Sequence, residues 1–247
     1  MVKTAIFVEG QTELIFVREL LLRYFEYQDV CIQCFSLVSG GNLEGARYDF
    51  LSDEARLYFQ IINVGNDRSV LTNLLKREKS IWNQGFHRII GLRDMYSEEY
   101  RRAANGKTIT QIVSEQFIAG HQKEIQNNAE QPENIFFRFA IMETEAWLLG
   151  LQRSLEKMDA RFTNAFIQQS LGFDLDSIDP ETNFFHPANV IEQVFELVGR
   201  AYRKKEGDIE SVVSGLAKAD YQNLLNSHKC ASFRQFFEVI PTTHLEF

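Results

Sequence analysis

Carboxylate side chains directly follow several apolar runs of this sequence, each run having the length of a buried strand. In an open α/β sheet the carboxyl ends of parallel strands meet at one edge, and ligands bind there. Carboxylates gathered at one edge repel one another unless a cation neutralises them, and hard oxygen ligands suit Mg²⁺ or Mn²⁺. The sequence therefore predicts a divalent-metal site formed by Glu9, Glu13, Asp94, Glu143 and Glu145.

A site of this composition could hydrolyse a phosphodiester with water as the nucleophile. Two divalent ions can flank the phosphorus and stabilise the attacking and the leaving oxygen. Glu9 would act as general acid/base or as a metal ligand, and Asp94 would hold metal, because packing poorly explains a carboxylate at the end of a buried strand. Lys204, within RAYRKKEGD, would steady the phosphate or belong to a solvated charge cluster.

Roles at helix ends compete with metal binding for some of these acids. Glu13 in the first turn of a helix favours the helix dipole whatever the function. Asp67 follows Gly65-Asn66 and is explained as a helix N-cap. Glu143 can start or cap the helix that follows it, so its role stays open at this point.

Strand and helix patterns alternate along the first part of the chain, and after about residue 160 the strand pattern fades. The predicted strands are residues 3–10, 29–37, 57–64, 87–94 and 134–141. The predicted helices are residues 11–25, 68–82, 108–126 and 143–158. This alternation predicts an α/β fold, with a mostly parallel sheet flanked by helices on both faces. We expect an α/β domain over residues 1–158 and a mostly helical region over 159–247 packed on it.

Composition limits the class of protein and its location. The chain has 247 residues and is 45% hydrophobic, which suits one large domain or a domain with a smaller appendage. Its apolar runs fall short of the roughly 20 residues that cross a bilayer, and its N-terminus lacks a signal-peptide pattern. Three cysteines imply no disulfide framework. We therefore expect a cytoplasmic protein without membrane contact.

The net charge of −8 constrains the partners. Coating DNA requires a basic surface that displaces counterions, but a metal-dependent nuclease has acidic ligands whose sign the bound cations reverse. Any nucleic acid would be held locally or with the help of a partner. The 21 phenylalanines also permit self-association. The sequence lacks a Walker motif, a G-x-G-x-x-G fingerprint and a nucleophile elbow.

Four segments of the chain resemble elements of known groups of proteins. VEGQTE (8–13) and GLRDMY (91–96) resemble the acidic elements of the Toprim fold of topoisomerases, primases and overcoming-lysogenization-defect (OLD) nucleases. ETEAWLL (143–149) resembles the E-x-E-A-W-L-L element of an uncharacterised Toprim-like family of prokaryotic proteins, often encoded beside ATPases in defence loci. HPANVIEQVFELVGRAYRKK (186–205) is similar in character to a later segment of that family.

The resemblance implies a Toprim-like, Rossmann-like sheet and an Mg²⁺- or Mn²⁺-dependent nuclease. Its substrate would be DNA or RNA, tRNA included, and it would serve defence against phage or other foreign DNA with an ATPase partner. The chain departs from the Toprim pattern at Tyr96, which stands where the second Asp of D-x-D is expected, with Glu98 and Glu99 close behind.

Two alternatives follow from this departure and from the motif pattern. In the first, the chain is a catalytically degenerate Toprim module that regulates an ATPase or is held by one. In the second, it is a phosphotransfer or nucleotide-processing enzyme that acts on small nucleotides. Metal binding with activity on nucleotides but not on polymers would favour the second.

Overall fold

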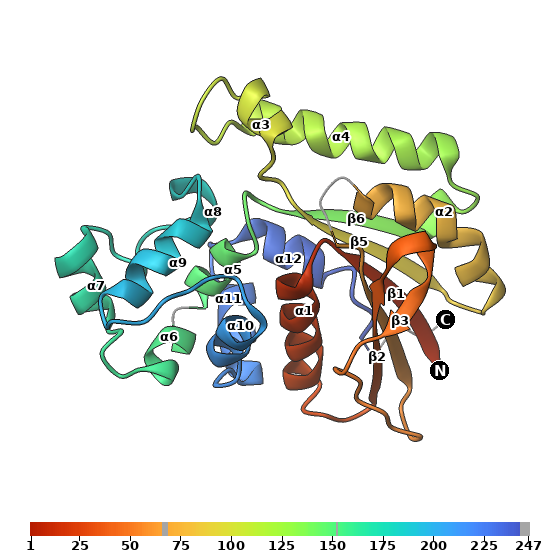
Figure 1. Cartoon of the computed structure of the whole chain (residues 1–247), viewed down its shortest axis with the longest axis horizontal. Helices are drawn as coiled ribbons and strands as arrows, with labels where there is room; N and C mark the ends of the chain where they lie inside the picture. Colours follow the sequence, from red (N-terminus) through yellow and green to blue (C-terminus); the bar gives the residue numbers. More distant parts are fainter. Residues whose placement is uncertain (66–68, 152, 243–247) are drawn as a thin grey trace. The chain divides into compact units, whose positions relative to one another are not determined.

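The structure is a computed structural model that describes residues 1–65, 69–151 and 153–242. It confirms the predicted α/β class: a six-stranded, mostly parallel sheet with flanking helices and a helical C-terminal region (Figure 1). Asp67 and the predicted start of the second helix at Arg68 lie outside the described residues.

The strand order is β3-β2-β4-β1-β5-β6. The strands are β1 (Val2–Val8), β2 (Val30–Leu37), β3 (Leu43–Gly45), β4 (Leu57–Asn63), β5 (Arg88–Asp94) and β6 (Ile135–Ala140). β1 pairs in parallel with β4 and β5, with Val8 opposite Asn63 and Leu92 respectively. β2 also pairs in parallel with β4, whereas the short β3 is antiparallel to β2. The first predicted strand therefore lies inside the sheet.

The burial of the central strands explains their sequences. In β1 every residue from Thr4 to Val8 is buried, and in β5 every residue from Ile89 to Asp94 is buried. A parallel strand covered on both faces reads as a continuous apolar run, not as an alternation. In β2, nearer the edge, burial alternates, with Val30, Ile32 and Cys34 inside.

Helices connect most of these strands, and in the described residues after β6 the regular elements are all helices (Figure 1). They are α1 (Gln11–Tyr24), α2 (Val70–Asn83), α3 (Glu98–Ala103), α4 (Gln111–Asn128), α5 (Glu145–Gly150), α6 (Arg153–Met158), α7 (Asn164–Leu171), α8 (Pro180–Asn183), α9 (Pro187–Glu196), α10 (Glu206–Val213), α11 (Lys218–Asn226) and α12 (Ala231–Phe237). α1 packs on β2 and β4, and α2 packs on β1. None of the described helices has the combination of length and apolar character that a bilayer crossing requires.

The chain forms two compact units. Unit 1 consists of Met1–Arg93, Glu115–Phe139 and Gln235–Phe247, and unit 2 of Asp94–Ser114 and Ala140–Arg234. The predicted boundary between residues 158 and 159 falls inside unit 2, so the division does not follow it. Each unit is built from separate segments of the chain. The order of helix and strand patterns along the sequence does not reveal such units.

Unit 2 has its own apolar core, which includes the tryptophan of the EAWLL segment. Trp147 is fully buried, and its ring lies 5.4 Å from that of Phe233. Phe162 and Phe195 form a second aromatic pair, 5.7 Å apart. The helix predicted over residues 143–158 is instead two helices, α5 and α6, because the chain leaves helical geometry at Leu151 (φ −86°, ψ 42°).

Candidate functional site

Asp94 is held at the end of β5 by Thr144, the residue directly before α5. Its Oδ1 accepts hydrogen bonds from the backbone N–H of Thr144 at 2.9 Å and from the Thr144 hydroxyl at 2.7 Å. Both residues are buried. The backbone of residues 95–96 donates to Ala140 and Met142, so the segments after β5 and β6 run side by side. Asp94 is therefore fixed beside the Glu143-Thr144-Glu145 segment.

Glu143 joins this segment to α9 and to Lys204. Its Oε2 accepts a 2.9 Å hydrogen bond from the backbone N–H of Ala188, in the first turn of α9, where the helix dipole favours a negative charge. Its Oε1 accepts a 3.1 Å hydrogen bond from the Lys204 ammonium. Pro187 begins α9, a position that suits proline because its missing N–H would have no partner in the helix.

Glu145 is the most deeply buried carboxylate of the cluster, with no exposed surface. Its Oε1 accepts a 2.9 Å hydrogen bond from the hydroxyl of Tyr202, and its Oε2 lies 3.1 Å from Nζ of Lys204. Lys204 thus bridges Glu143 and Glu145 with a single ammonium. Unit 2 brings together four of the predicted site residues, namely Asp94, Glu143, Glu145 and Lys204.

The carboxylates keep Lys204 charged. Burial disfavours its ammonium form, but the negative charges of Glu145, Asp94 and Glu143 outweigh this and raise the pKa of Lys204 above its usual value. A lysine with a raised pKa does not serve as a general base near neutral pH. It acts as a fixed positive charge, which is the property that phosphate binding requires.

Two residues of the cluster's backbone adopt a conformation that side chains other than glycine rarely take. Met142, directly before Glu143, has φ 64°, and Lys204 has φ 52°. Left-handed backbone at such residues costs roughly 1–3 kcal/mol and persists where the surrounding structure imposes it. Both outliers lie where the chain delivers a charged side chain to the cluster, which is consistent with a functional constraint there.

A buried hydrogen-bond network holds the EAWLL segment in place. Nε1 of Trp147 donates to Oε1 of Glu181 at 2.8 Å and contacts Oγ of Ser232 at 2.9 Å. The Ser232 hydroxyl also donates to Glu181 and accepts from the backbone N–H of Ile141. Burial is the largest influence on Glu181 and raises its pKa to about 7. The sequence does not single out this acid, because Asp179-Pro180-Glu181 has the pattern of an ordinary helix start.

Glu9 and Glu13 belong to unit 1. Glu9 directly follows β1, and Glu13 is a buried residue in the first turn of α1. The glycine between them leaves room for the second acid: a Cβ atom at Gly10 would lie 3.1 Å from Oε2 of Glu13. The G of VEGQTE therefore lets the Glu13 carboxylate fold back over the start of the helix.

The donor set of unit 2 is chemically suited to Mg²⁺ or Mn²⁺, since it consists of carboxylate oxygens. Within residues 1–65, 69–151 and 153–242, no three His, Cys, Asp or Glu side chains form a ready-made metal cage. The Lys204 ammonium instead takes the position of a cation between Glu143 and Glu145. Mg²⁺ commonly binds through one or two carboxylates and keeps several waters, so the residues present fit such an ion once Lys204 yields a carboxylate.

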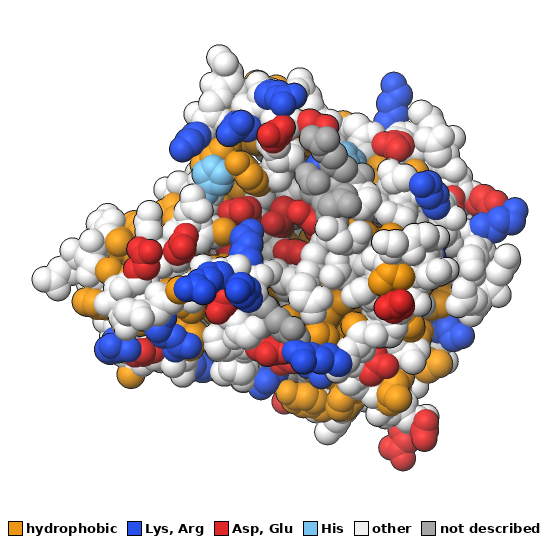
Figure 2. Space-filling view, in the orientation of Figure 1, with side chains coloured by type: hydrophobic (Ala, Val, Ile, Leu, Met, Phe, Trp, Pro, Cys, Tyr) orange, Lys and Arg blue, Asp and Glu red, His pale blue; other side chains and the backbone are white. Residues whose placement is uncertain are grey.

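The distribution of surface charge favours binding of a polyanion such as a nucleic acid at a local site over binding along an extended surface. Acidic and basic side chains are interspersed over the face in Figure 2, and the described basic residues visible there form no continuous stripe. The net charge of −8 points the same way. Extended coating of a duplex requires a basic surface that this face does not present.

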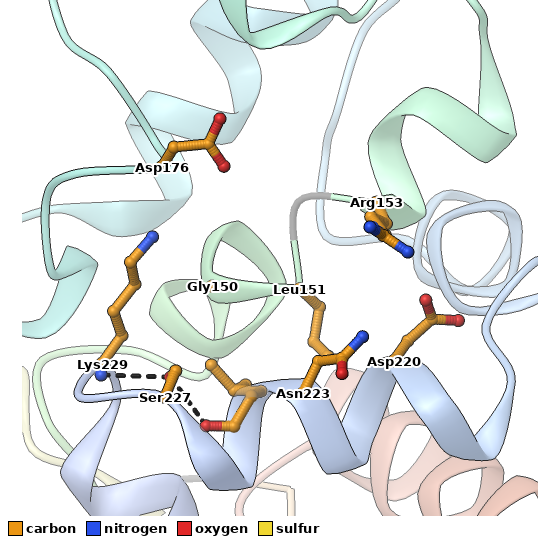
Figure 3. A pocket seen from close by; sticks show the side chains of 9 residues that line it. Gly150, Leu151, Arg153, Asp176, Asp220, Asn223, Ser227 and Lys229 are labelled. Atoms are coloured by element: carbon orange, nitrogen blue, oxygen red, sulfur yellow. Dashed lines mark hydrogen bonds between the residues drawn. The ribbon is translucent and has the colours of Figure 1, made fainter.

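A separate pocket of about 320 Å³ lies within unit 2 (Figure 3). Arg153 and Asp220 line one side, and Asp176 and Lys229 line the other. Asp220 pairs with Lys157, and the Lys229 ammonium donates to the carbonyl of Leu175. These charges are engaged in local structure, and the lining includes none of the predicted site residues.

Comparison with known proteins gives one match. The profile of a family described as "Domain of unknown function (DUF4276)" matches residues 8–240. No curated protein and no solved structure matches the chain. The matched segment spans every candidate residue from Glu9 to Lys204 and most of the 247 residues. The chain therefore belongs to the DUF4276 family.

Proposed function

We propose that this chain is a metal-dependent nuclease of the Toprim class, a phosphodiester hydrolase that acts on DNA or RNA. The observation that carries the proposal is the convergence of Asp94, Glu143 and Glu145 around the ammonium of Lys204. Buried acids gathered around a single cation are more than packing requires, and perturbed groups of this kind cluster at functional sites. The resemblance of VEGQTE and ETEAWLL to Toprim elements supports the same reaction class.

Each candidate site residue of unit 2 has a role in this proposal. Thr144 orients the Asp94 carboxylate, a proposed metal ligand, through two hydrogen bonds to its Oδ1. The first turn of α9 fixes Glu143, and Tyr202 fixes Glu145. Lys204 stays positively charged and steadies a phosphate oxygen. A bound Mg²⁺ or Mn²⁺ would supply Lewis-acid stabilisation of the charge that develops on the phosphate.

Glu9 and Glu13 enter the proposal through the sequence. Glu9 would act as general acid/base or as a ligand, and Glu13 as a further ligand. These roles are tested by an isosteric change at the residue itself. Glu9→Gln and Asp94→Asn should each weaken Mn²⁺ binding in calorimetry, by about 10-fold or more, because each removes one charged ligand.

The decisive experiment measures cleavage of plasmid DNA and of total tRNA with Mg²⁺ or Mn²⁺. The proteins compared are the wild type, Glu9→Gln, Asp94→Asn and Glu143→Gln. Glu78→Gln is the matched control, because Glu78 is also a buried carboxylate but lies in α2, where it accepts hydrogen bonds from Trp82 and Glu130. We expect the three site variants to lose roughly 100-fold or more in rate and the control to keep its activity.

Two results would count against the nuclease proposal. Wild-type protein that neither cleaves any of these substrates nor binds Mn²⁺ would contradict the proposal. Cleavage that survives in all three site variants would show that these residues do not catalyse it, and that the activity belongs to another site or to a contaminant.

A second candidate is a catalytically degenerate module that regulates an ATPase or is held by one. Two observations favour it: Tyr96 stands where a second Asp is expected, and Lys204 already neutralises Glu143 and Glu145. In that case Lys204 is a structural counterion, and replacing it would affect stability without any effect on metal affinity. The cleavage and calorimetry above separate this candidate from the nuclease.

The biological setting that we propose follows the sequence resemblance. It is a cytoplasmic role in defence against phage or other foreign DNA, with an ATPase as partner. The acidic net charge makes help from such a partner useful, because the chain offers little general attraction for nucleic acid.

A further inference from the structure

Three half-buried rings lie together in unit 2 beside the carboxylate cluster, and we name them the aromatic shelf: Tyr96, Phe185 and His186. The ring of Tyr96 lies 4.4 Å from that of His186 and 5.7 Å from that of Phe185, edge to face in both cases. Phe185 and His186 are 5.0 Å apart. Each ring therefore contacts the other two while part of each side chain remains exposed.

The aromatic shelf rests on a rigid support. Phe185 lies against the fully buried ring of Tyr100, at 6.5 Å. The Tyr100 hydroxyl is hydrogen-bonded to both the N–H and the carbonyl of Thr110 and to the hydroxyl of Ser114. Rings supported in this way lose little conformational freedom when a planar ligand stacks on them.

The shelf is tied to the candidate site through its backbone. The N–H of Tyr96 donates to the carbonyl of Met142 at 2.7 Å, directly before Glu143. His186 is two residues before Ala188, whose N–H binds the carboxylate of Glu143. A ligand on the shelf would therefore extend towards the carboxylates that we propose as the hydrolytic centre.

Exposed basic residues belong to the segment that supports the shelf: Arg101 directly follows Tyr100 in α3, and the ring of Tyr100 contacts Phe185. Burial is the largest cause that lowers the pKa of His186; the negative charge of Glu143 opposes it, and the positive charges of Lys107, Lys204 and Arg101 add smaller decreases. Arg101 and Lys107 are exposed, in α3 and in the loop that follows it. Aromatic faces combined with exposed cations are the two features by which proteins hold unstacked bases together with their phosphates.

We propose that the aromatic shelf stacks an unpaired base of a single-stranded nucleic acid and that Arg101 and Lys107 contact the adjoining backbone. This inference rests on the proposed function and deepens it by naming the substrate class. A base in an intact duplex is stacked on its neighbours and cannot present its face to the rings, so a duplex of the same sequence would not use the shelf. Tyr96, where a second Asp is expected, then contributes substrate binding.

The test measures binding, so that it does not depend on cleavage. A fluorescein-labelled single-stranded oligonucleotide, as DNA and as RNA, is titrated with the full-length protein by fluorescence anisotropy, with Ca²⁺ in place of Mg²⁺. Gel analysis afterwards verifies that the oligonucleotide is intact. The variants are Tyr96→Leu, Phe185→Leu and the conservative Tyr96→Phe, and a labelled duplex of the same sequence is the comparison ligand.

We expect Tyr96→Leu and Phe185→Leu each to weaken single-strand binding by roughly 5- to 100-fold, the range of one lost base–ring stack. Tyr96→Phe keeps the ring and should bind within about 2-fold of wild type. The matched control is Phe173→Leu: Phe173 is also half-buried in unit 2 and pairs with Phe184 at 5.0 Å, but it lies outside the shelf. Its binding should equal that of the wild type.

Three results would overturn the inference: wild type that does not bind single strands, duplex bound as tightly as the single strand, or leucine variants that bind as the wild type does. The last result together with metal-dependent cleavage would leave the nuclease standing and remove only the shelf. Weakened binding in both leucine variants, without cleavage by the wild type, would support the shelf as a single-strand binding site and remove the nuclease proposal.

Discussion

Nζ of Lys204 lies 3.1 Å from Oε2 of Glu145, a carboxylate without exposed surface, although 39% of the lysine side chain itself is exposed. The cation therefore reaches from the surface to an acid that water does not reach. An ion pair of this kind differs from a fully buried one, because one partner can turn towards solvent while the other cannot. Among the described residues, Lys204 thus supplies the positive charge that offsets Glu143 and Glu145 while part of its own side chain stays in contact with solvent.

Removal of this counterion should destabilise the protein. In Lys204→Met the buried Glu145 loses its positive partner, and breaking a buried pair costs about 3–5 kcal/mol when both groups are inaccessible. Because Lys204 is partly exposed, we expect a smaller loss, about 1–3 kcal/mol in the free energy of unfolding by urea. Lys123 is an exposed lysine of α4, and Lys123→Met should change the free energy of unfolding by less than about 0.5 kcal/mol.

The same variant reports on the metal. If the Lys204 ammonium holds the place of a cation, Mn²⁺ should stabilise Lys204→Met more than it stabilises the wild type, since a ligand that binds only the folded state adds to its stability. Equal stability of Lys204→Met and wild type would show that the ion pair contributes nothing. Equal response of the two proteins to Mn²⁺ would assign Lys204 a purely structural role.

Glu181 should make stability depend on pH between about 4.5 and 7. Burial raises its pKa from 4.5 to about 7 in the folded protein, so the folded state binds this proton more tightly than the unfolded chain does. The group's contribution to stability is therefore fully present below about pH 4.5, falls as the pH rises to about 7, and is constant beyond. The difference amounts to about 3 kcal/mol, at 1.36 kcal/mol per pKa unit.

Urea unfolding of wild type and Glu181→Gln at pH 5 and at pH 7.5 would measure this effect. Glutamine does not titrate, so the wild type should lose about 2.5 kcal/mol more than the variant between the two pH values. Parallel losses in the two proteins would mean that Glu181 is ionised throughout and that the hydrogen bonds from Trp147 and Ser232 dominate over burial.

The strands of the sheet were predictable because burial leaves a direct trace in the sequence. β1 and β5 are apolar over nearly their whole length, and acids follow or end them, as expected at the carboxyl edge of a parallel sheet. The break between α5 and α6 was not predictable, because apolar spacing continues through LLGLQ while the chain turns at Leu151. Periodicity detects which face is buried and is insensitive to a change of axis.

The candidate site was partly predictable for a similar reason. Glu143, Glu145 and Lys204 were proposed from motifs, but their ion pairs join residues about 60 positions apart and arise only from tertiary packing. Thr144 left a recognisable signal, a hydroxyl residue just before a helix, yet its hydroxyl binds Asp94 and not the helix N-terminus. Glu181 left none, since its partners Trp147 and Ser232 are distant in sequence.

The glycine that ends the EAWLLG segment is required by packing. A Cβ atom at Gly150 would lie 2.7 Å from Sγ of Cys230 and 3.0 Å from Cδ1 of Leu224, both of them buried. Gly150→Ala should therefore cost about 1–3 kcal/mol, as overpacking of a core does. Gly120, exposed in α4, has nothing within 4 Å of its Cβ position, so Gly120→Ala should be neutral or stabilise by up to about 1 kcal/mol. Thermal unfolding of both variants would measure the contrast, and similar melting temperatures would refute it.

Gly10 tests whether Glu13 belongs to the reactive site. The Cβ atom of Gly10→Ala would lie 3.1 Å from Oε2 of Glu13, so the carboxylate must shift by a few tenths of an ångström, which the flexible end of a side chain allows. Stability should change by less than about 1 kcal/mol. Because a misplacement of about 1 Å in a reactive site can cost roughly 100-fold, we expect a loss of about 10-fold in Mn²⁺-dependent cleavage.

The control for this prediction is Gly45→Ala, since Gly45 in β3 has nothing within 4 Å of its Cβ position. Cleavage assays and Mn²⁺ calorimetry on both variants separate the possible roles of Glu13. A loss in Gly10→Ala alone would support Glu13 as a ligand whose position the glycine permits. Unchanged cleavage and unchanged Mn²⁺ affinity in Gly10→Ala would instead leave Glu13 as an acid that stabilises the first turn of α1 through the helix dipole, with no part in the reaction.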